Sequence, residues 1–226
     1  MAEGFDGGAA ASAAGSPAKK DELRCFVVSP IQTNCYAYVS GGACLVVDPG
    51  DSGAAVAERL GDVRVDYIAA THGHGDHVGG VAALKAATGA PFLISAADAE
   101  MATHAGEVSE LGIAYDDDAP LPDRELAEGD VIHVGTATFT VMETPGHTPG
   151  GVVLLGGGSA AGVAFVGDTL FPGSHGRTDL AGGDEAAICR SLARMAREIP
   201  PETQLLCGHG PSTTMARELK QNPFLR

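Results

Sequence analysis

The chain of 226 residues contains few basic and few aromatic side chains. Lys and Arg together number 14 against 29 Asp and Glu, so the formal net charge is −15. Aromatic residues make up 5% of the chain, and Trp is absent. Binding to nucleic acid or to an anionic membrane surface needs clustered Lys and Arg that neutralise phosphate. The composition therefore predicts neither a nucleic-acid partner nor a membrane partner.

Cysteine pairs and long apolar runs are also missing. The five cysteines form no CxxC pair and no even set, which argues against a disulfide framework and is typical of a reducing compartment such as the cytoplasm. No stretch of about 18 apolar residues is present, so we expect no transmembrane helix. Residues 1–22 are rich in Ala and Gly and lack the apolar centre of a secretory signal. We expect them to form a disordered tail before a single domain at residues 23–226.

The rest of the chain alternates between strand patterns and helix patterns. β-branched runs and later period-2 patterns predict strands, the main ones at residues 24–29, 35–40, 43–48, 66–72, 131–134, 137–144, 151–156 and 162–168. An amphipathic pattern predicts a helix at residues 184–199, and the acidic segment 105–124 is expected to be an exposed loop. Both halves place strands first and then alternate helix with strand. Two sheets packed face to face, with helices on their outer sides, would accommodate both halves in one α/β fold.

The densest polar feature is the stretch THGHGDHVGG, which contains His72, His74, Asp76 and His77. It follows a predicted strand, at the edge of the sheet where α/β folds place their chemistry. His72 and His74 are two residues apart, so in an extended segment they point to the same side. Asp76 and His77 follow a turn and can face a second point nearby. One short loop could thus serve two metal ions, whereas the alternative is a polar loop of hydrogen-bonded histidines.

Three more ligand-type residues follow predicted strands and lie beside Gly or Pro: His147, Asp168 and His209. Imidazole and carboxylate ligands without thiolates suit zinc, iron or manganese. Seven such residues exceed the four that a closed structural zinc site needs. The set therefore predicts two divalent ions with open coordination positions, about 3.5–4 Å apart.

The HxHxDH motif, followed at these intervals by a single His, a single Asp and a single His, resembles the metallo-β-lactamase superfamily. The resemblance covers roughly residues 24–226. Within that superfamily the segments GDTLFPGSHGRTDLAGGD, CGHGPSTT and NPFLR are similar to the short glyoxalase II-like hydrolases. The resemblance implies an αββα sandwich of two mixed sheets with helices on the outer faces, which agrees with the strand and helix patterns.

The resemblance also implies two metal positions joined by one carboxylate. His72, His74 and His147 would hold the first ion, Asp76, His77 and His209 the second, and Asp168 would bridge them. The implied enzyme is a binuclear hydrolase, with zinc as the expected metal and iron or manganese as alternatives. It would cleave a small-molecule thioester such as S-lactoylglutathione through a hydroxide that bridges the metals, and it would act as a monomer or homodimer. Asp76 would also orient the attacking water.

Two positions bear on the substrate. By the same resemblance Arg177 would contact the substrate, although a structural ion pair with Asp179 or Asp184 is an equal alternative. Asp179 stands where the full-length glyoxalase II enzymes carry Tyr, which weakens the assignment to glutathione thioesters. Asp168 stands where the best-known metallo-β-lactamases carry Cys, which argues against antibiotic hydrolysis.

Two further interpretations stay open. Persulfide dioxygenases resemble this sequence too, and they would use one iron held by His72, His147 and Asp168. Another hydrolase of the same fold with an unknown substrate is the third possibility. Asp48, which ends a predicted strand, is expected either to orient a ligand histidine or to cap a loop.

Overall fold

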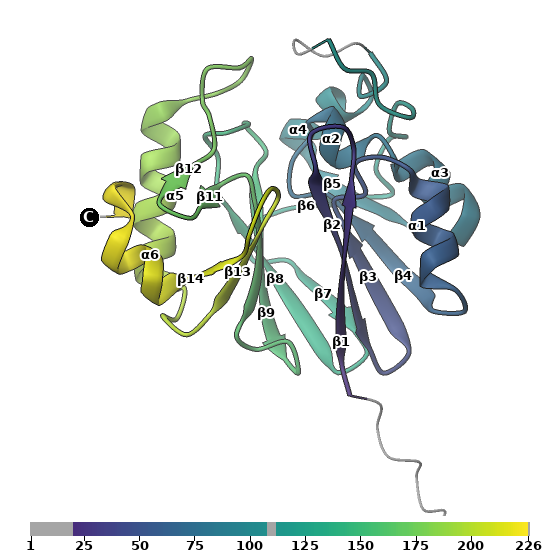
Figure 1. The fold of residues 1–226 in the computed structure, drawn as a ribbon, viewed down its shortest axis with the longest axis horizontal. Helices are drawn as coiled ribbons and strands as arrows, with labels where there is room; N and C mark the ends of the chain where they lie inside the picture. The colour runs from purple at the N-terminus through teal and green to yellow at the C-terminus, as the bar shows by residue number, and fades with distance from the viewer. Residues whose placement is uncertain (1–19, 108–111, 226) are drawn as a thin grey trace, which may run out of the picture.

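The computed structural model describes residues 20–107 and 112–225. The chain forms a sandwich in which two six-stranded sheets face each other and helices cover both outer sides (Figure 1). This is the αββα arrangement expected from the sequence. Residues 1–19 of the expected tail lie outside the described residues, and the first strand already begins at Glu22. No helix in the described part of the chain is long and apolar enough to cross a membrane.

The first sheet has the strand order β1-β2-β3-β4-β5-β6. Its strands are Glu22–Val28, Thr33–Ser40, Ala43–Val47, Arg64–Ala69, Phe92–Ser95 and Arg124–Leu126. β1, β2 and β3 form an antiparallel meander, because tight turns join them. β3 to β6 run parallel, because helical crossovers separate most of them in the chain.

The second sheet has the order β14-β13-β10-β9-β8-β7. In chain order its strands β7, β8, β9, β10, β13 and β14 are Val131–Val134, Ala137–Glu143, Val152–Gly158, Val163–Gly167, Gln204–Cys207 and Thr213–Thr214. Only the β10–β13 pair among them is parallel. A separate small hairpin is formed by β11, Leu170–Phe171, and β12, Ser174–His175.

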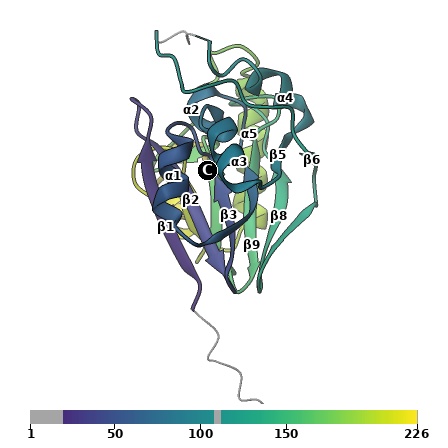
Figure 2. The ribbon, with the colours of Figure 1, turned by 90° about the vertical axis from the view of Figure 1, so that its right-hand side faces the viewer.

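Helices cover both outer faces, and Figure 2 looks onto those beside the first sheet. The helices α1 to α6 are Gly53–Leu60, Gly75–Val78, Val81–Thr88, Ala96–Ala102, Glu185–Glu198 and Met215–Gln221, and a 3₁₀ turn spans Pro223–Leu225. Buried side chains of α1, α3 and α4 pack on the first sheet. Those of α5 and α6 pack on the second. The amphipathic pattern at residues 184–199 is therefore confirmed as α5.

Strand periodicity produces the layers. In β2, Tyr36 and Tyr38 point into the core between the sheets, whereas Cys35 and Ala37 point toward the helices. Such two-sided burial follows from the alternation of side chains along a strand whose two faces are both covered. Phe139 and Phe165 complete an aromatic cluster with these tyrosines at centroid distances of 5.2–5.5 Å. This central layer fixes how the two sheets stack.

The expectation of an exposed loop at residues 105–124 is wrong in part. Tyr115 is 8% exposed and Ala119 is 2% exposed. Tyr115 packs against Gly75 and Gly79, where an added Cβ would lie only 2.6 and 2.5 Å from its side chain. The acidic composition of the segment predicted exposure. Gly75 and Gly79, at the two ends of α2, have no side chains and leave the space that Tyr115 fills.

The C-terminal segment holds the small hairpin in place. Asn222, which is fully buried, donates hydrogen bonds from Nδ2 to the carbonyl oxygens of Phe171 and Ser174 at 3.3 and 2.9 Å. Glu218, also fully buried, accepts from the backbone N–H of Gly173 at 2.7 Å and from the Thr213 hydroxyl at 2.6 Å. Glu218 of α6 and Asn222 just after it therefore tie the paired strands β11 and β12 to the C-terminal helix.

Replacement of Asn222 by Ala should lower the free energy of unfolding by about 1–3 kcal/mol, because it removes a buried side chain that donates to two partly buried carbonyl groups. Urea denaturation followed by circular dichroism measures this change. Gln221→Ala, at the exposed last residue of α6 beside Asn222, is the matched control and should change the free energy by less than about 0.5 kcal/mol. Equal midpoints for both variants would contradict the role assigned to Asn222.

Candidate metal centre

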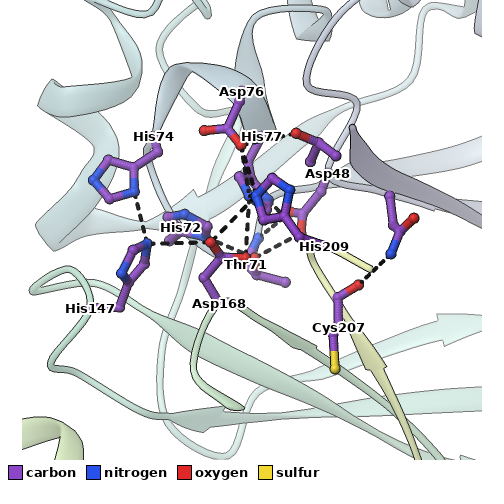
Figure 3. A network of polar contacts seen from close by, with 12 residues as sticks. Asp48, Thr71, His72, His74, Asp76, His77, His147, Asp168, Cys207 and His209 are labelled. Atoms are coloured by element: carbon purple, nitrogen blue, oxygen red, sulfur yellow. Dashed lines mark hydrogen bonds and ion pairs between the residues drawn. The ribbon is translucent and has the colours of Figure 1, made fainter. Parts of the chain in front are cut away.

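The seven predicted ligand-type residues converge at one end of the sandwich (Figure 3). Four segments supply them, each just after the carboxyl end of a strand. The segment after β4 and the short helix α2 carry His72, His74, Asp76 and His77, and the loops after β8, β10 and β13 carry His147, Asp168 and His209. Since these four strands end at the same edge of the sandwich, residues that are far apart in sequence meet in space.

Three histidines form the first group. The ligand-type atoms of His72, His74 and His147 lie within 4.8 Å of one another. Nδ1 of His74 and Nε2 of His147 are 2.9 Å apart. Nε2 of His72 is buried and has no hydrogen-bond partner. Because buried polar atoms are almost always satisfied, this orphaned nitrogen at the centre of the group points to an ion as its partner.

The second group consists of Asp76, His77 and His209, whose ligand-type atoms also lie within 4.8 Å of one another. Oδ2 of Asp76 is 3.1 Å from Nε2 of His209 and 3.3 Å from Nε2 of His77. The two imidazole Nε2 atoms are 3.4 Å apart. The three side chains thus face one common point.

Asp168 lies between the two groups. Its carboxylate is 3.6 Å from Nε2 of His147 on one side, and 3.4 and 3.5 Å from Nε2 of His77 and His209 on the other. Its Oδ1 is buried without a hydrogen-bond partner. Imidazole nitrogens and carboxylate oxygens in this number are a donor set that suits zinc, iron or manganese. The orphaned atoms and the donor chemistry together fit metal ions.

Asp48 contacts the segment that carries His72 and His77. Its carboxylate accepts from the backbone N–H and the hydroxyl of Thr71 at 2.7 and 2.8 Å, and it lies 3.0 Å from Nδ1 of His77. The Thr71 hydroxyl is in turn 3.1 Å from Nδ1 of His72. Asp48 is 1% exposed and adopts a left-handed backbone with φ of 54°. It therefore orients two ligand histidines, and the strained backbone is consistent with a functional position.

Asp98 joins two of the loops and was not singled out in the sequence. Its fully buried carboxylate accepts from the backbone N–H of Gly73 at 2.9 Å and of Gly150 at 2.7 Å. Gly73 lies between His72 and His74, and Gly150 follows His147. One carboxylate on α4 therefore sets the spacing between the segments that carry the first group. No local motif marks this role, because both partners are distant in sequence.

Other contacts fix the remaining ligands. Thr33 at the start of β2 donates its hydroxyl to Oδ2 of Asp76 at 2.9 Å. Nδ1 of His147 lies 2.7 Å from the carbonyl oxygen of Arg177, so this nitrogen is the donor and Nε2 is left to face the centre. At Gly208 an added Cβ would lie 2.1 Å from Oδ1 of Asp168. A residue without a side chain is required there for β13 to approach the centre.

The electrostatics of the site separate neutral from charged groups. Burial lowers the pKa of His72 well below its usual range and that of His74 to about 3, so both imidazoles are neutral, as metal ligation requires. Burial alone would lower the pKa of His77, but Asp76 and Asp168 outweigh it and raise that pKa well above its usual value. Burial raises the pKa of Asp168. The two buried carboxylates of Asp76 and Asp168 therefore favour a positive charge at this point of the site, which a bound cation would supply.

A pocket of about 470 Å³ opens above the centre. Its lining residues are Ile31, His74, Gly75, Asp76, Met101, Tyr115, His147, Asp168, Phe171, Arg177, Leu180, Ala181 and His209. Ligand-type residues and Arg177 form its polar part, and apolar side chains from both halves of the sandwich form its walls. A small molecule of mixed polarity can therefore reach the centre.

Arg177 lies at the pocket and forms an ion pair that the sequence offered as an alternative role. Its side chain lines the pocket, and its guanidinium also forms a two-point ion pair with Asp179 at 2.6 and 2.8 Å. Asp184 has a different function, because it caps α5 by accepting from the backbone N–H of Ala187 at 2.9 Å. The structure thus selects Asp179 over Asp184 as the partner of Arg177.

A family model described as the metallo-beta-lactamase superfamily matches residues 28–209. This match covers most of the chain and includes all seven ligand-type residues. The chain therefore belongs to the metallo-β-lactamase superfamily, whose fold the two facing sheets reproduce.

Two curated relatives share the name hydroxyacylglutathione hydrolase. The chain is 31% identical to GloC of Haemophilus influenzae, over 88% of this chain and 95% of the relative. It is 36% identical to the hydroxyacylglutathione hydrolase of Cereibacter sphaeroides, over 85% of this chain and 69% of the relative. The chain therefore matches nearly all of one relative and about two thirds of the other.

Solved structures add three comparisons. BLEG-1, described as a B3 metallo-β-lactamase, is 32% identical with a TM-score of 0.80, covering 90% of this chain and 99% of that chain. TTHA1623 in a di-iron-bound form is 36% identical with a TM-score of 0.80, covering 89% and 100%. ETHE1 from Myxococcus xanthus is 25% identical with a TM-score of 0.70, covering 89% and 83%. Proteins of this fold thus carry names for different activities.

Replacement of Asp98 by Asn should weaken metal binding without removing a ligand. The amide keeps one acceptor, but its NH₂ group faces one of the two glycine N–H donors, which loosens the loops that carry His72, His74 and His147. We expect zinc affinity to fall about 10–100-fold, as for other groups that orient ligands. Competition with a chromophoric chelator measures this, and Asp66→Asn on the surface of β4 is the control. Unchanged zinc affinity in Asp98→Asn would contradict the role of this residue.

Proposed function

We propose that the protein is a binuclear metal-dependent hydrolase that cleaves a thioester. The position of Asp168 carries the proposal: its carboxylate lies within 3.6 Å of His147 in one group, and of His77 and His209 in the other. A carboxylate shared in this way suits two ions better than one. Asp48, Asp98 and Thr33 orient the groups around a centre that opens to a pocket.

Two divalent ions, with zinc as the expected metal, would supply water deprotonated near neutral pH and would polarise the acyl carbonyl. His72, His74 and His147 would hold one of them, and Asp76, His77 and His209 the other, with Asp168 between. No Ser or Cys nucleophile is needed in such a site. The protein's own residues then have to position the water, the acyl group and the leaving thiol.

Asp76 is the residue that orients the water. Burial opposes its ionisation, but His77 outweighs this and holds the pKa of Asp76 well below its usual range. Its carboxylate lines the pocket and is fixed by the Thr33 hydroxyl, so it can accept a hydrogen bond from the attacking water. As the water oxygen bonds to the acyl carbon, the carbon–sulfur bond breaks. The thiolate takes a proton from solvent at the pocket mouth, and a carboxylic acid and a thiol are released.

The substrate class rests on the relatives and on the pocket. Two curated relatives are named hydroxyacylglutathione hydrolase, which supports S-lactoylglutathione as the first substrate to test. Apolar walls that include Met101, Tyr115 and Phe171 favour a substrate with an apolar portion. All five cysteines are unpaired, which supports a reducing compartment such as the cytoplasm as the place of the reaction.

Zinc-loaded protein should hydrolyse S-D-lactoylglutathione, and His77→Ala should lower kcat/KM by more than about 100-fold. Loss of groups that only orient a ligand already costs 10–100-fold, and His77 is a ligand-type residue itself. The initial rate of loss of the thioester absorbance measures the reaction.

The matched control is His133→Ala, which removes an exposed imidazole from β7. Its rate should equal that of the unaltered protein. A penicillin tested beside the thioester separates this activity from that named for BLEG-1. No thioester hydrolysis above the rate of His77→Ala would overturn the proposal, and rapid penicillin hydrolysis would replace it.

A second candidate is a mononuclear iron dioxygenase that acts on a persulfide, with His72, His147 and Asp168 as its ligands. The likeness to ETHE1 favours testing it, and the di-iron-bound form of TTHA1623 shows that a similar site can hold iron. Against it, Asp168 also groups with His72 and His77, so its carboxylate faces both sets of imidazoles.

Iron-loaded protein should show no oxygen uptake with glutathione persulfide above that of the His72→Ala variant. An oxygen electrode gives this result directly, and metal analysis of the same sample gives the number of ions bound. Rapid oxygen uptake with one iron per chain would favour the dioxygenase over the hydrolase.

A further inference from the structure

Of the described residues that line the pocket, Arg177 is the only Lys or Arg. Its Nε and Nη2 atoms donate to the two carboxylate oxygens of Asp179 at 2.6 and 2.8 Å. This planar two-point contact occupies the Nε–Nη2 edge of the guanidinium, one of the two edges that can bind a carboxylate at two points. An anionic ligand in the pocket therefore meets an arginine that is already paired with the carboxylate of Asp179.

The pair is exposed and can exchange partners. The side chains of Arg177 and Asp179 are 48% and 69% exposed. Ion pairs in such positions contribute little to stability, because water and salt screen them and two long side chains lose freedom. The Arg177 guanidinium lowers the pKa of Asp179 to about 2, so the competing carboxylate stays charged at neutral pH.

The backbone beneath the pair is fixed to the metal centre. The carbonyl oxygen of Arg177 accepts from Nδ1 of the ligand-type residue His147 at 2.7 Å. The next residue, Thr178, donates its hydroxyl to Glu185 at the start of α5 at 2.6 Å. These two hydrogen bonds fix the backbone at residues 177 and 178. An exchange of partners at Arg177 therefore involves side chains alone and leaves the guanidinium within reach of a ligand in the pocket.

We propose that Asp179 is a built-in competitor for the anionic group of the substrate, which displaces it from Arg177 on binding. Asp179 then determines how strongly the pocket favours anionic over neutral ligands. The affinity for an anionic ligand then reflects how much more strongly Arg177 binds the ligand carboxylate than it binds that of Asp179. It is weaker than the affinity that an unpaired arginine would give. The proposal rests on the proposed function only in taking a thioester with a carboxylate as the substrate.

Binding of non-hydrolysable thioethers tests the proposal separately from the reaction. The probes are S-hexylglutathione and its neutral-carboxyl form, the diethyl ester, titrated by calorimetry into zinc-loaded protein. Asp179→Asn should tighten binding of the free acid about fivefold, the equivalent of one exposed ion pair. Binding of the diester should change less than about twofold, because it brings no carboxylate.

Asp66→Asn is the matched control. Asp66 forms the same two-point pair with Arg64, two residues earlier, at 2.6 and 3.0 Å. Neither residue is among those that line the pocket, so this variant changes the net charge by the same amount without touching the site. It should leave the affinity for both probes unchanged. In the background of Arg177→Gln, the further change Asp179→Asn should have no effect on either probe.

Three outcomes would overturn the proposal. Equal effects of Asp179→Asn and Asp66→Asn would show a general charge effect. Weaker binding of the free acid to Asp179→Asn would show that Asp179 positions Arg177 for the ligand. Equal tightening of acid and diester would show that the carboxylate is not the group bound. Failure of the proposed function looks different, because the thioester would then not be hydrolysed whatever the affinities of these variants.

Discussion

The metal centre depends on buried carboxylates that hold its histidines in place. An unpaired charge inside a protein is costly, so each buried acid must meet donors or cations. Asp48 meets this condition through Thr71 and His77. Asp98 meets it through two backbone N–H groups. The hydrogen bonds that offset the cost of burying these carboxylates also fix the loops that carry the ligand-type residues. The same contacts therefore contribute to stability and to the geometry of the site.

The arrangement of strands in the sandwich brings the ligand-type residues of the two sheets together. Parallel neighbours β3 to β5 end at one edge of the first sheet, and the parallel pair β10 and β13 ends at the facing edge of the second. The aromatic layer around Tyr36 and Phe165 sets how these edges meet. Each sheet therefore contributes part of the ligand set, and neither half alone contains a complete centre.

The pocket has ligand-type residues on its floor and other side chains around its rim. The family match spans all seven ligand-type residues, and similar proteins carry names for several different activities. Tyr115, Phe171 and Arg177 also line the pocket but are not among the ligand-type residues. They are therefore the first side chains to vary in tests of selectivity. Asn222, the residue after α6, acts from outside the pocket, because its side chain donates to the backbone carbonyl of Phe171.

The sequence by itself determined the fold class and the seven residues that converge. Strand periodicity and the spacing of ligand-type residues after strands are local patterns, and they can be recognised without coordinates. Only the tertiary structure revealed Asp98, Thr33 and Tyr115, and chose Asp179 as the partner of Arg177. Thr33 is 43 positions from Asp76, and Asp98 is 52 from Gly150. Contacts that close such long stretches of chain leave no periodic trace in the sequence, so folding alone decides them.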